Sequence, residues 1–154
     1  MQLNFEKFNF QIKPDNNGKN LIFDTVRKKY VTLTSEEWVR QHTIHQLIKN
    51  KWSASRMSIE RVLPKSRKRY DAVHYNQNGH PELLVECKAP SIKITQKTLD
   101  QATGYIHLQD VPYVLLTNGL QHFFIARRQN ELKIVNEIPL YSEIKNLFLP
   151  PEKD

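Results

Sequence analysis

The segment LVECKAP, residues 84–90, places two opposite charges at the end of a run that otherwise has the composition of a buried β-strand. Alternate residues of a strand point to the same face, so Glu86 and Lys88 share one face. The residues on the other face are apolar and can pack on a helix: Leu83, Val85 and Cys87. The two charges therefore either form a structural ion pair or meet a group outside the chain, such as a metal ion and a phosphate.

Hydrophobic periodicity and turn residues divide the chain into elements in the order helix, three strands, helix, strand. The helices are expected at 33–52 and 94–109, and the strands at 58–64, 65–75, 82–88 and 111–118. Short strands are expected before this core and a hairpin with a short helix after it: 8–12, 21–26, 29–33, 120–128, 131–138 and 139–149. Residues 150–154 are expected to fray. No internal repeat and no second domain is evident.

Both expected helices begin with a residue that suits an N-cap. Thr34 precedes the first helix, and Glu37 follows at the spacing of a capping box. Thr95 precedes the second helix. Gly104 weakens that helix by about 1 kcal/mol relative to alanine, which predicts that another group approaches its backbone closely.

The net charge of +7 results from 23 Lys and Arg against 16 Asp and Glu. The basic residues form two groups: Arg27 to Lys29, and Lys49, Lys51, Arg56, Arg61, Lys65, Arg67, Lys68 and Arg69. Such clustering favours a polyanion, DNA or RNA, as the partner, although a solvated basic face has the same composition.

Several classes of protein are excluded by the sequence. The single cysteine leaves no internal disulfide and no cysteine-based zinc cluster, and the histidines show no metal-ligand spacing. The N-terminus lacks the pattern of a signal peptide. The apolar stretch 111–126 is interrupted by polar residues and is too short to span a membrane. We therefore expect a cytoplasmic protein with no membrane partner.

Asp71 and Glu86 are the predicted metal ligands. If the turn between their strands sets the right register, the two carboxylates become neighbours and form the hard oxygen site that Mg²⁺ prefers. Lys88 beside them can orient a water and stabilise charge on a phosphate. The pattern predicts phosphodiester hydrolysis and perturbed protonation of the cluster. The competing interpretation is an exposed ion pair worth about 0 to 1 kcal/mol, with Asp71 a residue at a strand edge.

The spacing Asp71, then Glu86-Cys87-Lys88 after an apolar strand, resembles the PD-(D/E)xK nuclease superfamily. The segments EEWVRQH, RYDAVHY, LLVECKAP, DQATGY and VPYVLLTNG occur in the order found in the N-terminal nuclease domain of type I restriction enzyme R subunits, and the similarity extends from about Arg27 to Ile138. The proline that usually precedes the aspartate is replaced by Tyr70.

The resemblance implies an α/β (α+β) fold with a restriction-endonuclease-like core. This core has a central mixed β-sheet flanked by helices in the order α-β-β-β-α-β, with extra N- and C-terminal strands. We expect a single domain over 1–154. It has its core at about 34–117, N-terminal strands within 5–33, and a C-terminal hairpin and helix within 120–149.

The resemblance also implies roles for individual residues. Asp71, Glu86 and the backbone carbonyl of Cys87 would bind the metal, and Lys88 would be the catalytic lysine. The first helix of the superfamily often supplies an acid, for which Glu37 is the first choice and Glu36 the second. The helix after Lys88 carries the family's Q-x-x-x-Y motif, here Gln101 and Tyr105. The competing roles are a cap for Glu37, a solvated residue for Gln101 and a core aromatic for Tyr105.

The function implied is a Mg²⁺-dependent DNA endonuclease in which Mn²⁺ can substitute. The residues expected to contact nucleic acid are Lys65, Arg67, Lys68, Arg69, Gln101 and Tyr105. No P-loop motif is present, so motor and specificity or methylation subunits would be separate partners. The alternatives are a catalytically idle nucleic-acid-binding module with the same fold, and a nuclease that acts on branched DNA or RNA.

Overall fold

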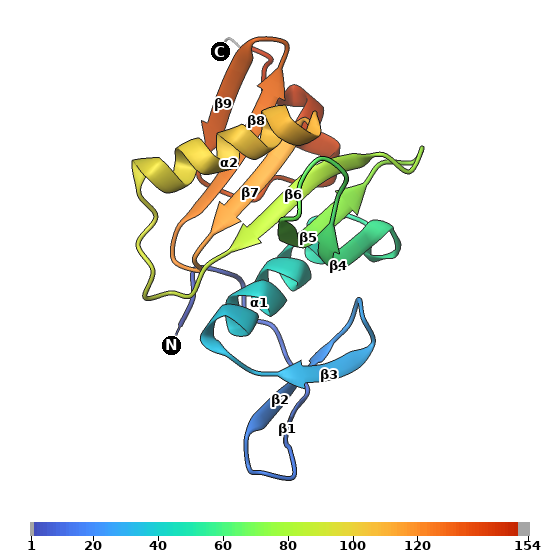
Figure 1. Cartoon of the computed structure of the whole chain (residues 1–154), viewed down its shortest axis with the longest axis vertical. Coiled ribbons are helices and arrows are strands. Elements are labelled where there is room, and N and C mark those ends of the chain that lie inside the picture. Colours follow the sequence, from blue (N-terminus) through green and yellow to red (C-terminus); the bar gives the residue numbers. More distant parts are fainter. Residues whose placement is uncertain (1, 151–154) are drawn as a thin grey trace.

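A mixed six-stranded sheet forms the centre of the structure, a computed structural model that describes residues 2–150 (Figure 1). The strands lie in sequence order across the sheet: β4 Met57–Val62, β5 Arg69–Tyr75, β6 Pro81–Cys87, β7 Tyr113–Thr117, β8 His122–Arg128 and β9 Glu131–Val135. Only the β6–β7 pair of this sheet is parallel. The predicted fold class, a mixed sheet flanked by helices, is confirmed.

Two helices cover opposite faces of this sheet, α1 Ser35–Lys49 and α2 Gln96–Gln109 (Figure 1). The core beneath α1 includes Val39, Leu47, Leu83, Val85 and Cys87. The core beneath α2 includes Tyr70, Leu84, Ala102, Ile106 and Val114. The predicted packing of the Leu83 face of β6 on a helix is therefore confirmed, and the other face of β6 is buried by α2.

The predicted N-caps are present at both helices. The backbone N–H of Glu37 donates to Thr34 Oγ1 at 3.0 Å, and Thr95 forms a capping box with Thr98. The close approach predicted at Gly104 is wrong, because within residues 2–150 no atom outside its chain neighbours and the adjoining backbone of α2 lies within 4 Å of a Cβ built there. Gly104 instead lies on the exposed side of α2.

The N-terminal strands form a small sheet of their own, which projects from the central body (Figure 1). Its antiparallel strands are β1 Ile12–Pro14, β2 Asn20–Asp24 and β3 Lys29–Thr32. The strand predicted at 8–12 is wrong for most of its length. Phe8 and Phe10 pack instead against α1, with ring centroids 5.5 Å and 4.7 Å from that of His45.

Two other elements differ in extent from the prediction. Residues 65–68 belong to the connection before β5. The C-terminal helix is a 3₁₀ helix, η2 Tyr141–Asn146. A second short 3₁₀ helix, η1 Ala54–Arg56, lies between α1 and β4. A 3₁₀ helix aligns residues three apart, so Tyr141 and Ile144 both pack on the core beneath α1. The fraying predicted at 150–154 falls, except for Pro150, outside the described residues. Between residues 2 and 150 no helix is both long and apolar enough to cross a membrane.

Gly119 lies in the β7–β8 turn, where the N-terminal segment crosses it. Its φ is +87°, and a Cβ there would lie 3.0 Å from Leu3 Cδ2 and 3.1 Å from Val39 Cγ2.

We expect Gly119→Ala to lower the free energy of unfolding by about 2–4 kcal/mol, because backbone strain and overpacking add. Gly79, with φ +81° and open space around it, is the matched control, and Gly79→Ala should cost only about 1 kcal/mol. Equal losses of unfolding free energy in Gly119→Ala and Gly79→Ala, measured by urea unfolding, would contradict the packing of the N-terminal segment against Gly119.

Candidate active site

The carboxylate of Asp71 lies where β5 and β6 stop pairing. The ladder between the two strands ends at Ala72 and Val85. One residue further, Asp71 Oδ2 accepts the backbone N–H of Cys87 at 2.8 Å, where a backbone carbonyl would otherwise act as acceptor. This bond places Asp71 beside the end of β6, next to Glu86, so the structure brings the two predicted acids together.

Burial and neighbouring charge raise the pKa of Asp71 from 3.8 to about 7. Loss of solvent is the largest cause, and the charges of Glu86 and Glu36 add to it, while the Cys87 N–H and the Arg40 guanidinium oppose it. Asp71 and Glu86 are only 8% and 9% exposed. The predicted perturbation of protonation in this cluster is confirmed for Asp71.

Glu86 has two lysines beside it. Lys68 Nζ lies 2.8 Å from Glu86 Oε2, and Lys88 Nζ lies 4.0 Å from Oε1. The contact with Lys68 lacks the angle of a hydrogen bond, so Oε2 is buried without a hydrogen-bond donor. Burial is the largest single influence and would lower the pKa of Lys68, but Glu86 and Tyr105 together outweigh it and the pKa is raised. Lys68 therefore stays charged at the carboxylate.

The two acids at the start of α1 occupy different surroundings. The Glu37 carboxylate is buried and lies 3.2 Å from Arg27 Nη2 and 3.3 Å from Arg40 Nε, and it accepts a hydrogen bond from Gln41 at 3.1 Å. Glu36 is exposed, and its charge contributes to the raised pKa of Asp71. Glu37 is thus tied into an ionic network, whereas Glu36 is open to solvent near Asp71.

Arg40 connects that network to the predicted ligands, and sequence reasoning missed it. Its Nη2 lies 3.5 Å from Asp71 Oδ1, and its Nη1 lies 3.3 Å from Glu60 Oε1. The available signal was the spacing of Glu37, Arg40 and Gln41, which places all three on one side of a helix.

Glu60 was also missed, because its position depends on the backbone. It lies in β4 between Ile59 and Arg61, which pair with Ala72 and Tyr70, so it faces Asp71 across the strands. Its φ of +53° is in the left-handed region, which costs a residue other than glycine about 1–3 kcal/mol. The carboxylate bridges two guanidinium groups.

The remaining predicted residues lie around this cluster. Tyr105 is partly buried and packs edge-on against Tyr70, with ring centroids 5.5 Å apart. Gln101 is exposed on the first half of α2. The structure therefore does not bring Gln101 into contact with the acids.

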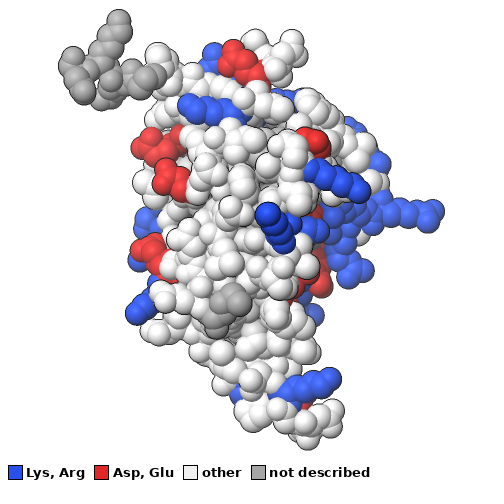
Figure 2. All heavy atoms as spheres, turned by 90° about the vertical axis from the view of Figure 1, so that its left-hand side faces the viewer, with Lys and Arg blue, Asp and Glu red and all other residues white. Residues whose placement is uncertain are grey.

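The residues expected to contact nucleic acid differ in burial: Lys65, Arg67 and Arg69 are exposed and Lys68 is half-buried. Figure 2 shows Lys and Arg gathered along one side of the molecule.

The donor set at the cluster suits a hard divalent cation bound partly by solvent. No three His, Cys, Asp or Glu side chains within residues 2–150 converge into a metal site. Mg²⁺ commonly uses one or two carboxylates with water and phosphate oxygens. Glu86, whose buried Oε2 is paired with the ammonium of Lys68, and the neighbouring high-pKa Asp71 fit that pattern. The Cys87 thiol points away toward Thr43 Oγ1, and burial raises its pKa, so it remains protonated.

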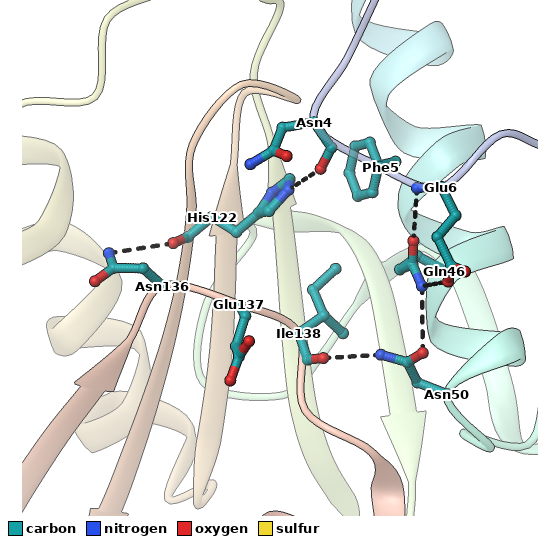
Figure 3. A pocket seen from close by; sticks show the side chains of 9 residues that line it. All are labelled: Asn4, Phe5, Glu6, Gln46, Asn50, His122, Asn136, Glu137 and Ile138. Atoms are coloured by element: carbon teal, nitrogen blue, oxygen red, sulfur yellow. Dashed lines mark hydrogen bonds between the residues drawn. The ribbon is translucent and has the colours of Figure 1, made fainter.

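A pocket of about 540 Å³ lies elsewhere, between β8, α1 and the N-terminal segment (Figure 3). Two of its polar side chains bond to backbone carbonyls: His122 Nε2 donates to the Asn4 carbonyl at 2.5 Å, and Asn50 donates to the Ile138 carbonyl at 2.8 Å. None of its lining residues belongs to the Asp71 cluster. These bonds attach both ends of the chain to the core.

Comparisons with known proteins agree with this fold. A family described as type I restriction enzyme R protein N terminus matches residues 35–139. No curated protein is significantly similar to the chain. The structure of a fragment described as an HsdR subunit of a type I restriction enzyme from Vibrio vulnificus YJ016 has 18% identity and a TM-score of 0.55, over 74% of this chain and 25% of that one. This similarity supports a shared fold.

Two further solved structures were found. The type IIG restriction endonuclease BpuSI has 21% identity and a TM-score of 0.45 over 68% of this chain and 12% of its own. A protein of Anabaena variabilis ATCC 29413, described as a nuclease belonging to DUF820, has 14% identity and a TM-score of 0.47 over 79% and 83%. The chain thus spans a quarter or less of the length of the first two structures.

Proposed function

Because the chain belongs to the family of type I restriction enzyme R protein N termini, we propose that it is a Mg²⁺-dependent DNA endonuclease domain that hydrolyses phosphodiester bonds. The observation that carries the proposal is the meeting of Asp71 and Glu86 at the end of β5 and β6, with Lys88 beside them. Burial, with the charge of Glu86 added to it, raises the pKa of Asp71 to about 7, and a divalent cation bound to both carboxylates would favour the ionised form of Asp71.

Asp71, Glu86 and the backbone carbonyl of Cys87 would hold Mg²⁺, or Mn²⁺ in its place. The bound ion would lower the pKa of a coordinated water and polarise the scissile phosphate. Glu36, exposed near Asp71, is the first-helix acid that we propose to face the ion through water, while Glu37 keeps Arg40 in place.

Lys88 would act on the substrate directly. Its ammonium lies 4.0 Å from Glu86 and is about one-third exposed, so it can reach a phosphate oxygen or a water at the end of β6. A cation in that position stabilises the negative charge that develops on the phosphate during attack. Arg40 on α1 lies 3.5 Å from Asp71 Oδ1 and would fix the orientation of the Asp71 carboxylate.

The exposed cations Lys65, Arg67 and Arg69 would bind the sugar–phosphate backbone, together with Gln101 and Tyr105 on α2. Contacts of this kind make binding strongly dependent on salt and largely independent of sequence. Motor and specificity or methylation subunits of a restriction complex would then select the DNA. Branched DNA or RNA remains an alternative substrate that a panel of nucleic acids would distinguish.

A second candidate is a nucleic-acid-binding module without catalysis. The observation that favours it is that each acid already has a cationic neighbour within the chain, Arg40 at Asp71 and Lys68 at Glu86. In that case the ionic contacts would be structural and the basic surface alone would be functional.

We expect the chain to nick supercoiled plasmid in the presence of Mg²⁺ or Mn²⁺ and to leave it intact in excess chelator, because the ion would be needed to activate the attacking water and polarise the phosphate. The measurement is the conversion of supercoiled to open-circular DNA, with binding followed in parallel by fluorescence anisotropy. Binding without nicking under every metal condition would favour the module.

A further inference from the structure

Lys68 occupies an unusual place for a residue of a surface connection. Its ammonium is closer to Glu86 than that of Lys88 is, 2.8 Å against 4.0 Å. It also lies over the rings of Tyr105 and Tyr70, 4.9 Å and 5.6 Å from their centroids. Aromatic faces attract cations, so two rings and a carboxylate hold one ammonium beside a predicted metal ligand.

A metal ion at Glu86 and the ammonium of Lys68 would compete. Glu86 Oε2, the oxygen nearest Lys68, is the buried one that accepts no hydrogen bond. Two cations drawn to one carboxylate oxygen repel each other. Binding of a divalent ion through that oxygen therefore requires Lys68 to move away.

The chain neighbours of Lys68 indicate where it can go. Lys65 and Arg67 are exposed cations on the same connection between β4 and β5, and the exposed Arg69 begins β5. Such a group attracts phosphates. The side chain of Lys68 is 27% exposed, and its four-carbon stem can swing outward to solvent. A phosphate at the surface could thus take over the ammonium that Glu86 releases.

We propose that Lys68 occupies the cation position at Glu86 in the DNA-free chain and transfers to a DNA phosphate, so that metal binding and DNA binding strengthen each other. This inference rests on the proposed function. By thermodynamic linkage, the factor by which DNA raises metal affinity equals the factor by which metal raises DNA affinity. Lys68 is therefore a positioning residue that weakens metal binding while DNA is absent.

The test measures Mn²⁺ binding to the whole chain by electron paramagnetic resonance, without DNA. We expect Lys68→Met to bind Mn²⁺ about five- to tenfold more tightly than the wild type, because the competing charge is gone. Methionine keeps an unbranched stem to pack on Tyr105. Lys133→Met is the matched control: it removes the same charge from the exposed strand β9, away from Glu86 and from the residues proposed to bind DNA, and its Mn²⁺ affinity should stay within about twofold of wild type.

A second measurement tests the coupling. Mn²⁺ should strengthen binding of a short duplex, checked for intactness by gel, by about tenfold in the wild type and in Lys133→Met, but by only about twofold in Lys68→Met. Circular dichroism verifies folding, and Lys68→Gln replaces Lys68→Met if the latter unfolds.

The outcomes are separable. If the wild type binds Mn²⁺ and cuts DNA but Lys68→Met matches Lys133→Met in Mn²⁺ affinity and in coupling, the role of Lys68 is overturned and the nuclease proposal stands. If neither the wild type nor Lys68→Met binds Mn²⁺, with or without DNA, both proposals fail. Mn²⁺ binding by Lys68→Met alone would support the role of Lys68 even where the wild type shows none.

Discussion

Replacing Asp71 by asparagine is expected to lower the rate of metal-dependent DNA cleavage by about 10²- to 10³-fold. Asparagine keeps the oxygen that accepts the Cys87 N–H and keeps the size of the side chain, but it removes the negative charge that would bind the cation. Lys88→Met should cause a loss of similar size by a different route, because it removes a positive charge from the phosphate. The measurement is the rate of plasmid nicking under saturating Mg²⁺.

The two variants differ in their response to metal. Asp71→Asn should require a higher Mn²⁺ concentration for half-maximal activity, whereas Lys88→Met should leave that concentration within about threefold of wild type. Glu131→Gln, on the exposed edge strand β9, is the control for loss of one carboxylate and should cleave like the wild type. Full activity in Asp71→Asn would remove Asp71 from the metal site and with it the proposed mechanism.

The part of the site that the sequence could predict is the part that follows from strand geometry. Alternation along 82–88 placed Glu86 and Lys88 on one face and the apolar residues on the other, and a short turn before β6 brought Asp71 alongside. Local signals of this kind depend on neighbours within one strand or one hairpin. The caps at Thr34 and Thr95 were predictable for the same reason.

The rest of the site depends on contacts between distant segments. Arg27 reaches Glu37 and Glu60 from the small N-terminal sheet, and no local pattern encodes that meeting. The left-handed backbone of Glu60 has no signature either, because residues other than glycine rarely adopt it. The sequence did place Lys68 among the basic residues, but its position against Glu86 rather than in solvent follows from the path of the β4–β5 connection.

Segments with strong apolar patterns were misassigned where packing replaced pairing. Phe8 and Phe10 alternate as in a strand, yet their rings fill the space beside His42 and His45 on α1. Burial of aromatic surface there outweighs the hydrogen bonds of a further strand. Alternation shows which residues seek an apolar surface, but not whether that surface is a sheet or a helix.

The same Asp71→Asn variant is expected to be more stable than the wild type at about pH 8, by roughly 2–4 kcal/mol. The unfolded chain releases the Asp71 proton near pH 3.8, whereas the folded chain holds it to about pH 7. Between those values the folded state binds more protons, so the stability of the wild type falls as the pH rises through this window and is flat above it. Asparagine does not ionise in this range, so the free energy of unfolding of Asp71→Asn should not show that decrease with pH.

Urea unfolding in chelator at several pH values measures the difference, which should vanish near pH 4 and grow until about pH 7. Glu131→Gln should stay within about 0.5 kcal/mol of wild type throughout. Added Mn²⁺ should stabilise the wild type at about pH 8 and leave Asp71→Asn nearly unchanged, because an ion that binds only the folded state adds its binding free energy to folding. If the unfolding free energies of the wild type and Asp71→Asn change in parallel from acid to alkaline pH, Asp71 ionises as in the unfolded chain. The electrostatic argument for a cation site would then be lost.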